Sequence, residues 1–63
     1  MKWTVFFTSA PPSGPTREEV RTVEAPTILR ALELADRTYC LHLRKVNYKV
    51  HIYKIEEEEY DRH

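Results

Sequence analysis

Residues 23–35 read VEAPTILRALELA and contain the clearest structural signal in the chain. The Thr27 hydroxyl can accept a hydrogen bond from a free backbone N–H one turn later, which predicts a helix that begins after this residue. Four apolar residues then recur at the i, i+3, i+4 and i+7 spacing of one helical face: Ile28, Ala31, Leu32 and Ala35. Val23 and Ala25 are two positions apart just upstream, so the end of a strand is expected to lead into this helix.

The helix is expected to extend well beyond this segment. The apolar spacing continues through Tyr39, Leu43 and Val46, but residues 38–40 are poor helix formers. We therefore place its end between Tyr39 and Lys45, with Asn47 as a stop signal.

Three other segments have the two-residue period of β-strands. Residues 2–9 form the first predicted strand, with the side that bears Trp3 facing the core. Residues 18–25 form the second, whose mixed polarity is typical of an edge strand. The third runs from Tyr48 to about Glu57, and its alternation predicts two sides: Tyr48, Val50 and Ile52 on one, and Lys49, His51, Tyr53 and Ile55 on the other.

A segment that contains three prolines and the only glycine, residues 10–16, separates the first two strands. We expect a mobile loop there, because proline removes backbone donors. It is either a plain hairpin connection or a proline-rich docking segment, and the proline spacing only partly fits the second reading.

The order strand, strand, helix, strand predicts an α+β protein of ββαβ topology. We expect a three-stranded antiparallel sheet of order 3-1-2 with one helix packed on one face. Since one helix covers only one face, the other face stays solvated or docks on a partner. The side chains predicted on this uncovered face are Phe6, Tyr53, Ile55 and Val20.

Composition limits the function. Sixty-three residues form a single domain with a small core, and equal numbers of basic and acidic residues produce no global attraction to nucleic acid or to an anionic membrane. The single cysteine, Cys40, fits a reducing cytoplasm, and no signal peptide or membrane span is recognisable. Cys40, His42 and His51 lack the second close pair of a zinc site, and no nucleophile has an arranged base. We expect no enzymatic activity, no metal, no cofactor and no small-molecule substrate.

Charge is segregated near the C-terminus. Between residues 37 and 55 every formal charge is positive, and the run Glu56, Glu57, Glu58, Glu59 and Asp61 is wholly acidic. The acidic residues form either a frayed tail over residues 57–63 or a mimic of nucleic acid that occupies a basic groove on a host enzyme. The basic residues are either ordinary solvated groups or, in Arg44, Lys49, Tyr53 and Lys54, a patch for a carboxylate-rich protein. Nucleic-acid binding by this patch is disfavoured by the neighbouring acidic run.

Several short motifs resemble the small inhibitor of bacterial RNA polymerase made by T-odd coliphages. They are Trp3-Thr4-Val5, Ala25-x-Thr27, Ala31-Leu32-Glu33-Leu34-Ala35, Tyr39 and a final strand with Val50. The resemblance implies the same three-stranded sheet with one helix, and binding to the jaw of the largest polymerase subunit in the host cytoplasm. It also implies that Glu33 and Asp36 present charge on the helix.

Two departures from that family concern its binding residues. The family has two arginines, two positions apart in the last strand, where this chain has Ile52 and Lys54, and Leu29 and Arg30 replace two of its helix carboxylates. We expect a non-enzymatic phage protein that inhibits a host macromolecular machine, with RNA polymerase as the first choice. The alternatives are a structural homo-oligomer that pairs through its open face or an edge strand, and the nucleic-acid mimic.

Overall fold

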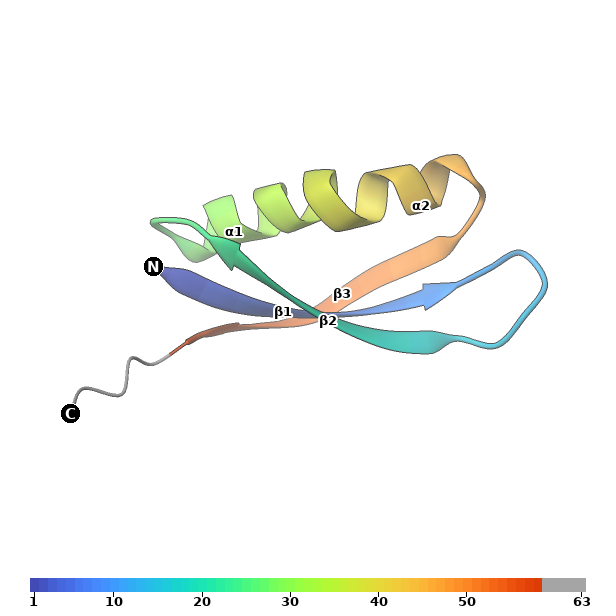
Figure 1. Cartoon of the computed structure of the whole chain (residues 1–63), viewed down its shortest axis with the longest axis horizontal. Coiled ribbons are helices and arrows are strands. Elements are labelled where there is room, and N and C mark those ends of the chain that lie inside the picture. Colours follow the sequence, from blue (N-terminus) through green and yellow to red (C-terminus); the bar gives the residue numbers. More distant parts are fainter. Residues whose placement is uncertain (59–63) are drawn as a thin grey trace.

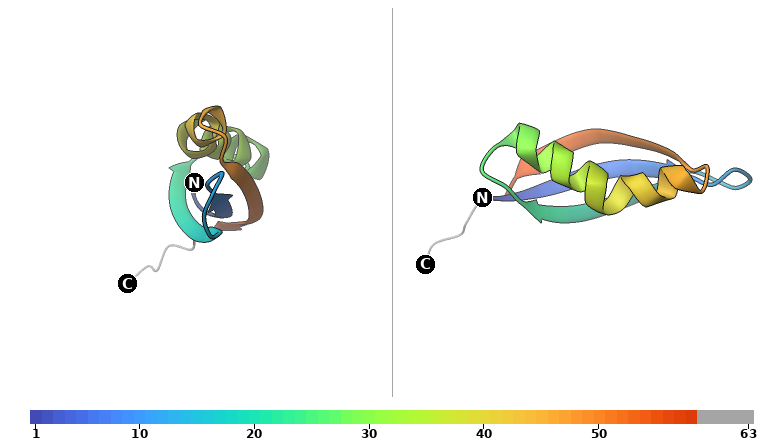
Figure 2. Two further views of the ribbon diagram at one scale, coloured as in Figure 1. Left: turned by 90° about the vertical axis from the view of Figure 1, so that its right-hand side faces the viewer. Right: turned by 90° about the horizontal axis from the view of Figure 1, so that it is seen from above.

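A three-stranded antiparallel sheet and one long, interrupted helix form the protein (Figure 1). The structure is a computed structural model that describes residues 1–58. Its elements are β1 (Lys2–Ala10), β2 (Arg17–Glu24), α1 (Ile28–Ala35), a π-helical segment η1 (Asp36–Cys40), α2 (Leu41–Lys45) and β3 (Lys49–Glu57). The sheet order β2-β1-β3 confirms the predicted ββαβ topology, with the first strand in the centre. Viewed along its length, the sheet curls toward the helix, which covers one face only (Figure 2).

The core lies between the central strand and the helix. Trp3, Val5, Phe7 and Ser9 face the helix and are buried, as the alternation of β1 predicts. The Trp3 indole Nε1–H donates a hydrogen bond of 2.9 Å to the carbonyl oxygen of Ala25, which fixes the segment before the helix.

Both ends of the helix follow their sequence signals. The Thr27 hydroxyl accepts a hydrogen bond of 3.2 Å from the backbone N–H of Arg30, which confirms the predicted N-cap. Asn47 has a φ of 68°, the left-handed conformation in which helices commonly end, and its N–H donates to the carbonyl oxygen of Arg44. The predicted end between Tyr39 and Lys45 is confirmed.

The π-helical segment η1 shifts the buried face of the helix. Ala35 and Cys40 are five positions apart and both are completely buried, because a π turn inserts one residue into the α-helical repeat. Leu43 then packs on the core, while the side chain of Val46 is 57 % exposed. The predicted apolar stripe is therefore only partly confirmed: Ala31 and Ala35 are buried, whereas Ile28 and Leu32 near its start are exposed, as is Val46 at its end.

A β-bulge interrupts the pairing of β3 with β1. Phe6 pairs with Lys54 and Phe7 pairs with Ile52, so Tyr53 has no partner of its own on β1. The extra residue turns Ile55 back toward the helix, where it packs on both core clusters. The prediction that Ile55 lies on the uncovered face is wrong, since strict alternation does not continue past a bulge.

This bulge leads to a testable expectation. Deleting Tyr53 should leave Ile52, Lys54 and Ile55 opposite their present partners on β1 and cost about 1 kcal/mol, the typical value for a point mutation. Deleting His51 should cost more, because it turns either Val50 or Ile52 away from the core. Urea unfolding followed by circular dichroism measures both, and equal losses of stability would contradict the assigned register.

Candidate protein-binding surface

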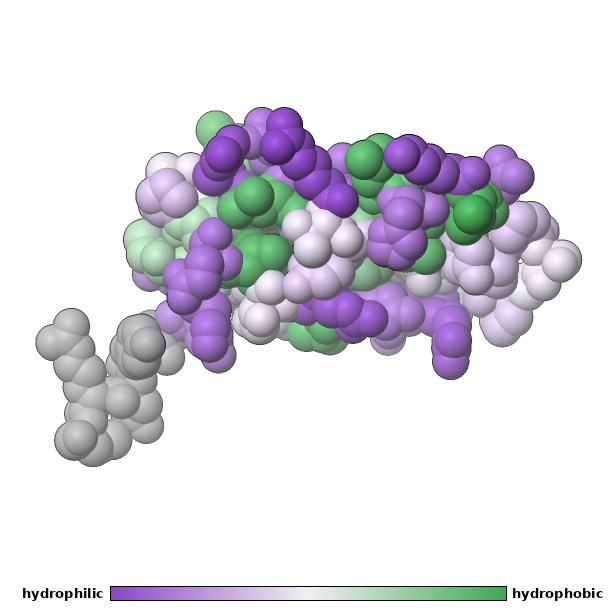
Figure 3. Space-filling view, turned by 45° about the horizontal axis from the view of Figure 1, so that its top comes forward, coloured by the Kyte–Doolittle hydropathy of each residue, from purple (hydrophilic) through white to green (hydrophobic). Residues whose placement is uncertain are grey.

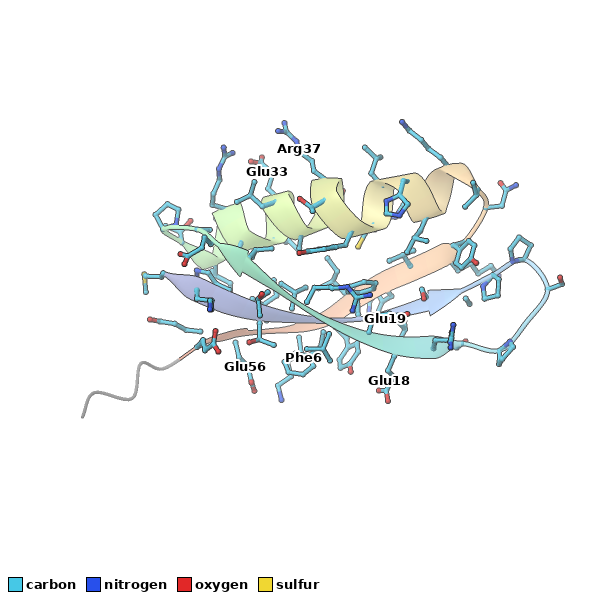
Figure 4. All side chains as sticks on the ribbon, in the orientation of Figure 1. Phe6, Glu18, Glu19, Glu33, Arg37 and Glu56 are labelled. Atoms are coloured by element: carbon cyan, nitrogen blue, oxygen red, sulfur yellow. The ribbon has the colours of Figure 1, made fainter. Side chains whose placement is uncertain are left out.

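The uncovered face of the sheet carries an aromatic cluster at its centre. Phe6 projects from β1 away from the helix, as do Glu18 and Glu56 from the two edge strands (Figure 4). The rings of Phe6 and Tyr53 have centroids 6.4 Å apart at an interplanar angle of 44°, and the Lys54 Nζ lies 5.2 Å from the Phe6 centroid. The bulge makes this possible, because it places Tyr53 and Lys54 beside the same residue of β1. Val20 lies opposite Phe6 on β2. We call Phe6, Val20, Tyr53 and Lys54 the Phe6 cluster.

Carboxylates from both edge strands hold the polar ends of this cluster. The Tyr53 hydroxyl donates a hydrogen bond of 3.2 Å to Glu18, and the Lys54 ammonium lies 2.8 Å from Glu56. The hydrogen bond and charge of Glu56 raise the pKa of Lys54, while desolvation and the bond to Glu18 raise the pKa of Tyr53. Tyr53 remains 47 % exposed and Val20 50 % exposed, so the cluster is ordered and accessible at once.

The predicted basic patch is not assembled in one place. Lys54 belongs to the Phe6 cluster, whereas Lys49 pairs with Ala10 at the hairpin end of the sheet. Arg44 lies on the helical side and forms an ion pair with Asp36. Of the four predicted members, only Tyr53 and Lys54 come together.

The two carboxylates predicted to present charge on the helix are both paired with arginine. Glu33 binds Arg30 one turn before it, and Asp36 binds Arg44 in α2. Glu33, Asp36 and Arg44 line an open groove of about 410 Å³ between the helix and β3, together with Leu29 and Leu32. Charged and apolar side chains alternate over the helical side of the molecule (Figure 3). Pairing leaves the carboxylates of this groove largely neutralised.

The acidic run begins inside the sheet. Glu56 and Glu57 are the last residues of β3, and the backbone N–H of Glu58 donates to the Lys2 carbonyl oxygen at 2.8 Å. The other two members of the predicted acidic tail, Glu59 and Asp61, lie outside the described residues. The predicted loop between the first two strands spans residues 11–16, since Ala10 still pairs with Lys49.

Both edges of the sheet carry features that oppose strand pairing with another molecule. β2 is rich in charged side chains, and β3 contains the bulge at Tyr53, which interrupts its ladder. These features weigh against the predicted alternative of a homo-oligomer that pairs through an edge strand.

Within residues 1–58, no three His, Cys, Asp or Glu side chains are grouped so that they could hold a metal ion. Cys40 is buried beside Phe7 in the core cluster, and this burial raises the pKa of its thiol. None of the described helices has the length and apolar character needed to cross a membrane.

The sequence prediction of the site missed the role of Phe6 as its centre and the bulge that builds it. One signal was available: Ile52 and Ile55 are both apolar but three positions apart, which a regular strand cannot place on one face. Comparisons with protein-family models, with curated proteins and with solved structures find no match for this chain.

Proposed function

We propose that this chain is a non-enzymatic protein-binding module that docks on its partner through the Phe6 cluster. One observation carries the proposal: the helix covers one face of the sheet, and the other face holds two aromatic rings, an aliphatic side chain and a lysine at its centre. Aromatic side chains held in place by their neighbours bind partners with little loss of conformational entropy. A partner surface that suits this cluster has an apolar area that packs on the two rings. Beside that area it has a carboxylate that can replace Glu56 as the counter-ion of Lys54.

The proposed partner is a host macromolecular machine, with bacterial RNA polymerase as the first choice, and the proposed role is that of a phage inhibitor acting in the host cytoplasm. Support comes from the sequence motifs that resemble the T-odd coliphage inhibitor and from the ββαβ topology that this resemblance implies. Lys54 occupies the position of one of the two arginines in the last strand of that family. Ile52, at the other position, faces the groove on the helical side, so binding through this strand would use a different set of contacts.

Binding to purified bacterial RNA polymerase tests the proposal directly. Lys54→Glu should weaken binding by about tenfold or more, because it reverses the only cation of the cluster. Lys45→Glu, which makes the same charge change at the end of α2, should bind like the unmodified protein. Lys49→Glu should also bind normally, because Lys49 lies outside the cluster.

The outcomes test two hypotheses separately: that the Phe6 cluster is the binding surface, and that RNA polymerase is the partner. Tight binding that is equal in all variants would remove the Phe6 cluster from the interaction, and no binding of the unmodified protein at micromolar concentration would remove the polymerase. Inhibition of transcription by the unmodified protein, and loss of inhibition in Lys54→Glu, is the result that supports both.

A further inference from the structure

A second concave site lies at the hairpin end of the molecule, on the side of the sheet that faces the helix. It is a cleft of about 290 Å³ between β2, the C-terminal half of the helix and the start of the hairpin loop. This volume is just below the usual range for small-molecule sites, so only a small ligand fits. The cleft is separate from the Phe6 cluster, because the sheet lies between them.

The base and walls of the cleft are apolar and aromatic. Phe7 and Leu43 form part of its lining, with the rings of Tyr39 and Tyr48. Tyr39 is held in position by two contacts: its hydroxyl donates to the Thr22 carbonyl oxygen at 3.2 Å, and the Arg21 guanidinium lies 5.9 Å from its ring centroid. A planar ligand would therefore meet a wall that is already ordered.

Positive charge predominates around the cleft. Arg17 and Arg21 are the register partners of the buried Ser9 and Val5, which places them on the helix-facing side of β2. Glu19 between them (Figure 4) is the single carboxylate in the lining. Glu19 is already bound to Arg21 at 3.1 Å. Arg17 forms no ion pair with any residue in the range 1–58. One guanidinium is thus free to bind an anion.

A buried hydroxyl adds a second polar group. Ser9 is the only polar residue of the described core, with 3 % of its surface exposed, and it lines the cleft. Its register partner on β2 is Arg17, so the hydroxyl and the free guanidinium come from paired positions on neighbouring strands. A serine hydroxyl beside an arginine is a common pair of donors for an oxyanion.

We propose that this cleft binds a small organic anion, with a planar apolar body against Tyr39, Tyr48 and Leu43 and a carboxylate or phosphate group bound by Arg17 and Ser9. Arginine suits this role because its planar donors match the geometry of such groups. The proposal is independent of the protein-binding function, since the two sites share no residue.

Titration of the ¹⁵N-labelled protein with sodium benzoate and with phenyl phosphate, followed by NMR, provides the test. We expect saturable shifts of the Ser9, Arg17 and Tyr48 amides in the millimolar range, and none with neutral benzamide. Arg17→Gln should weaken binding about fivefold. The matched control Arg30→Gln, on the exposed side of α1, should bind normally. Ser9→Ala should also weaken binding, and its spectrum reports whether the fold persists.

Three outcomes would overturn the site. Benzamide that binds as well as benzoate would show that the charge is irrelevant. Shifts that remain linear up to the highest concentration would show general salt effects only. Unchanged affinity in Arg17→Gln would place the anion elsewhere. A response to phenyl phosphate but not to benzoate would support the site and assign it to phosphate groups.

Discussion

Replacing Phe7 with alanine is expected to remove most of the free energy of unfolding at 25 °C, leaving about 0–2 kcal/mol. Phe7 is 1 % exposed and packs in the core cluster with Val5, Ala35 and Cys40. Truncation of a buried phenylalanine costs about 3–5 kcal/mol, from lost apolar burial and from the cavity that remains. A domain of this size has a free energy of unfolding near the lower end of the usual range, about 5 kcal/mol. Urea unfolding followed by circular dichroism measures the free energy that remains.

Phe6 provides the matched control, because it is the same residue type one position earlier on the same strand. Its side chain lies on the uncovered face and only partly out of solvent. Phe6→Ala should cost about 1 kcal/mol, a typical value for a partly exposed position. It should also weaken partner binding through the Phe6 cluster. If both substitutions destabilised the protein equally, a second layer would have to cover the open face, and the proposed docking surface would be lost with it.

Trp3→Ala is expected to have the second largest effect, a loss of about 3–5 kcal/mol. Trp3 is 8 % exposed, packs with Ala25 and Ala31 and donates its indole N–H to the Ala25 carbonyl oxygen. The substitution therefore removes a large apolar side chain and also leaves a carbonyl oxygen without its donor. Urea unfolding, compared with that of the unmodified protein, measures the change in free energy.

Trp3→Phe separates these two contributions. It retains a ring in the core but removes the hydrogen bond, so it should cost about 1–3 kcal/mol, the penalty for an unpaired buried acceptor and a smaller ring. A loss as large as that of Trp3→Ala would mean that the hydrogen bond, and not packing, holds the segment before the helix. No loss in Trp3→Phe would contradict the role of the indole N–H.

The candidate site could be predicted only in part. Tyr53 and Lys54 were identified from charge and alternation, and the structure brings them together beside Phe6. Arg44 and Lys49 were grouped with them because they are near in sequence. The structure separates them, since Arg44 belongs to the helical layer and Lys49 to the far end of β3. Sequence proximity does not report which layer or which end of a strand a side chain occupies.

The helix carboxylates Glu33 and Asp36 were expected from the resemblance alone to present charge. In the structure Glu33 is exposed and Asp36 is partly exposed, and each forms an ion pair with an arginine. Arg30 is one turn from Glu33 and could have been paired with it from the sequence. The Arg44–Asp36 pair spans η1 and depends on the π turn that the sequence did not reveal.

Local patterns in the amino-acid sequence determined the elements, their order and the face of β1 that forms the core. Alternation in β1, the Thr27 cap and the stop at Asn47 act over a few residues, so they can be recognised before any fold is known. The π turn at Cys40 was decided by tertiary structure alone, and so was the bulge at Tyr53 apart from the three-residue spacing of Ile52 and Ile55. Each inserts one residue so that Ile55 or Cys40 reaches a core shared by several elements, and the free energy gained there depends on partners that are distant in the chain.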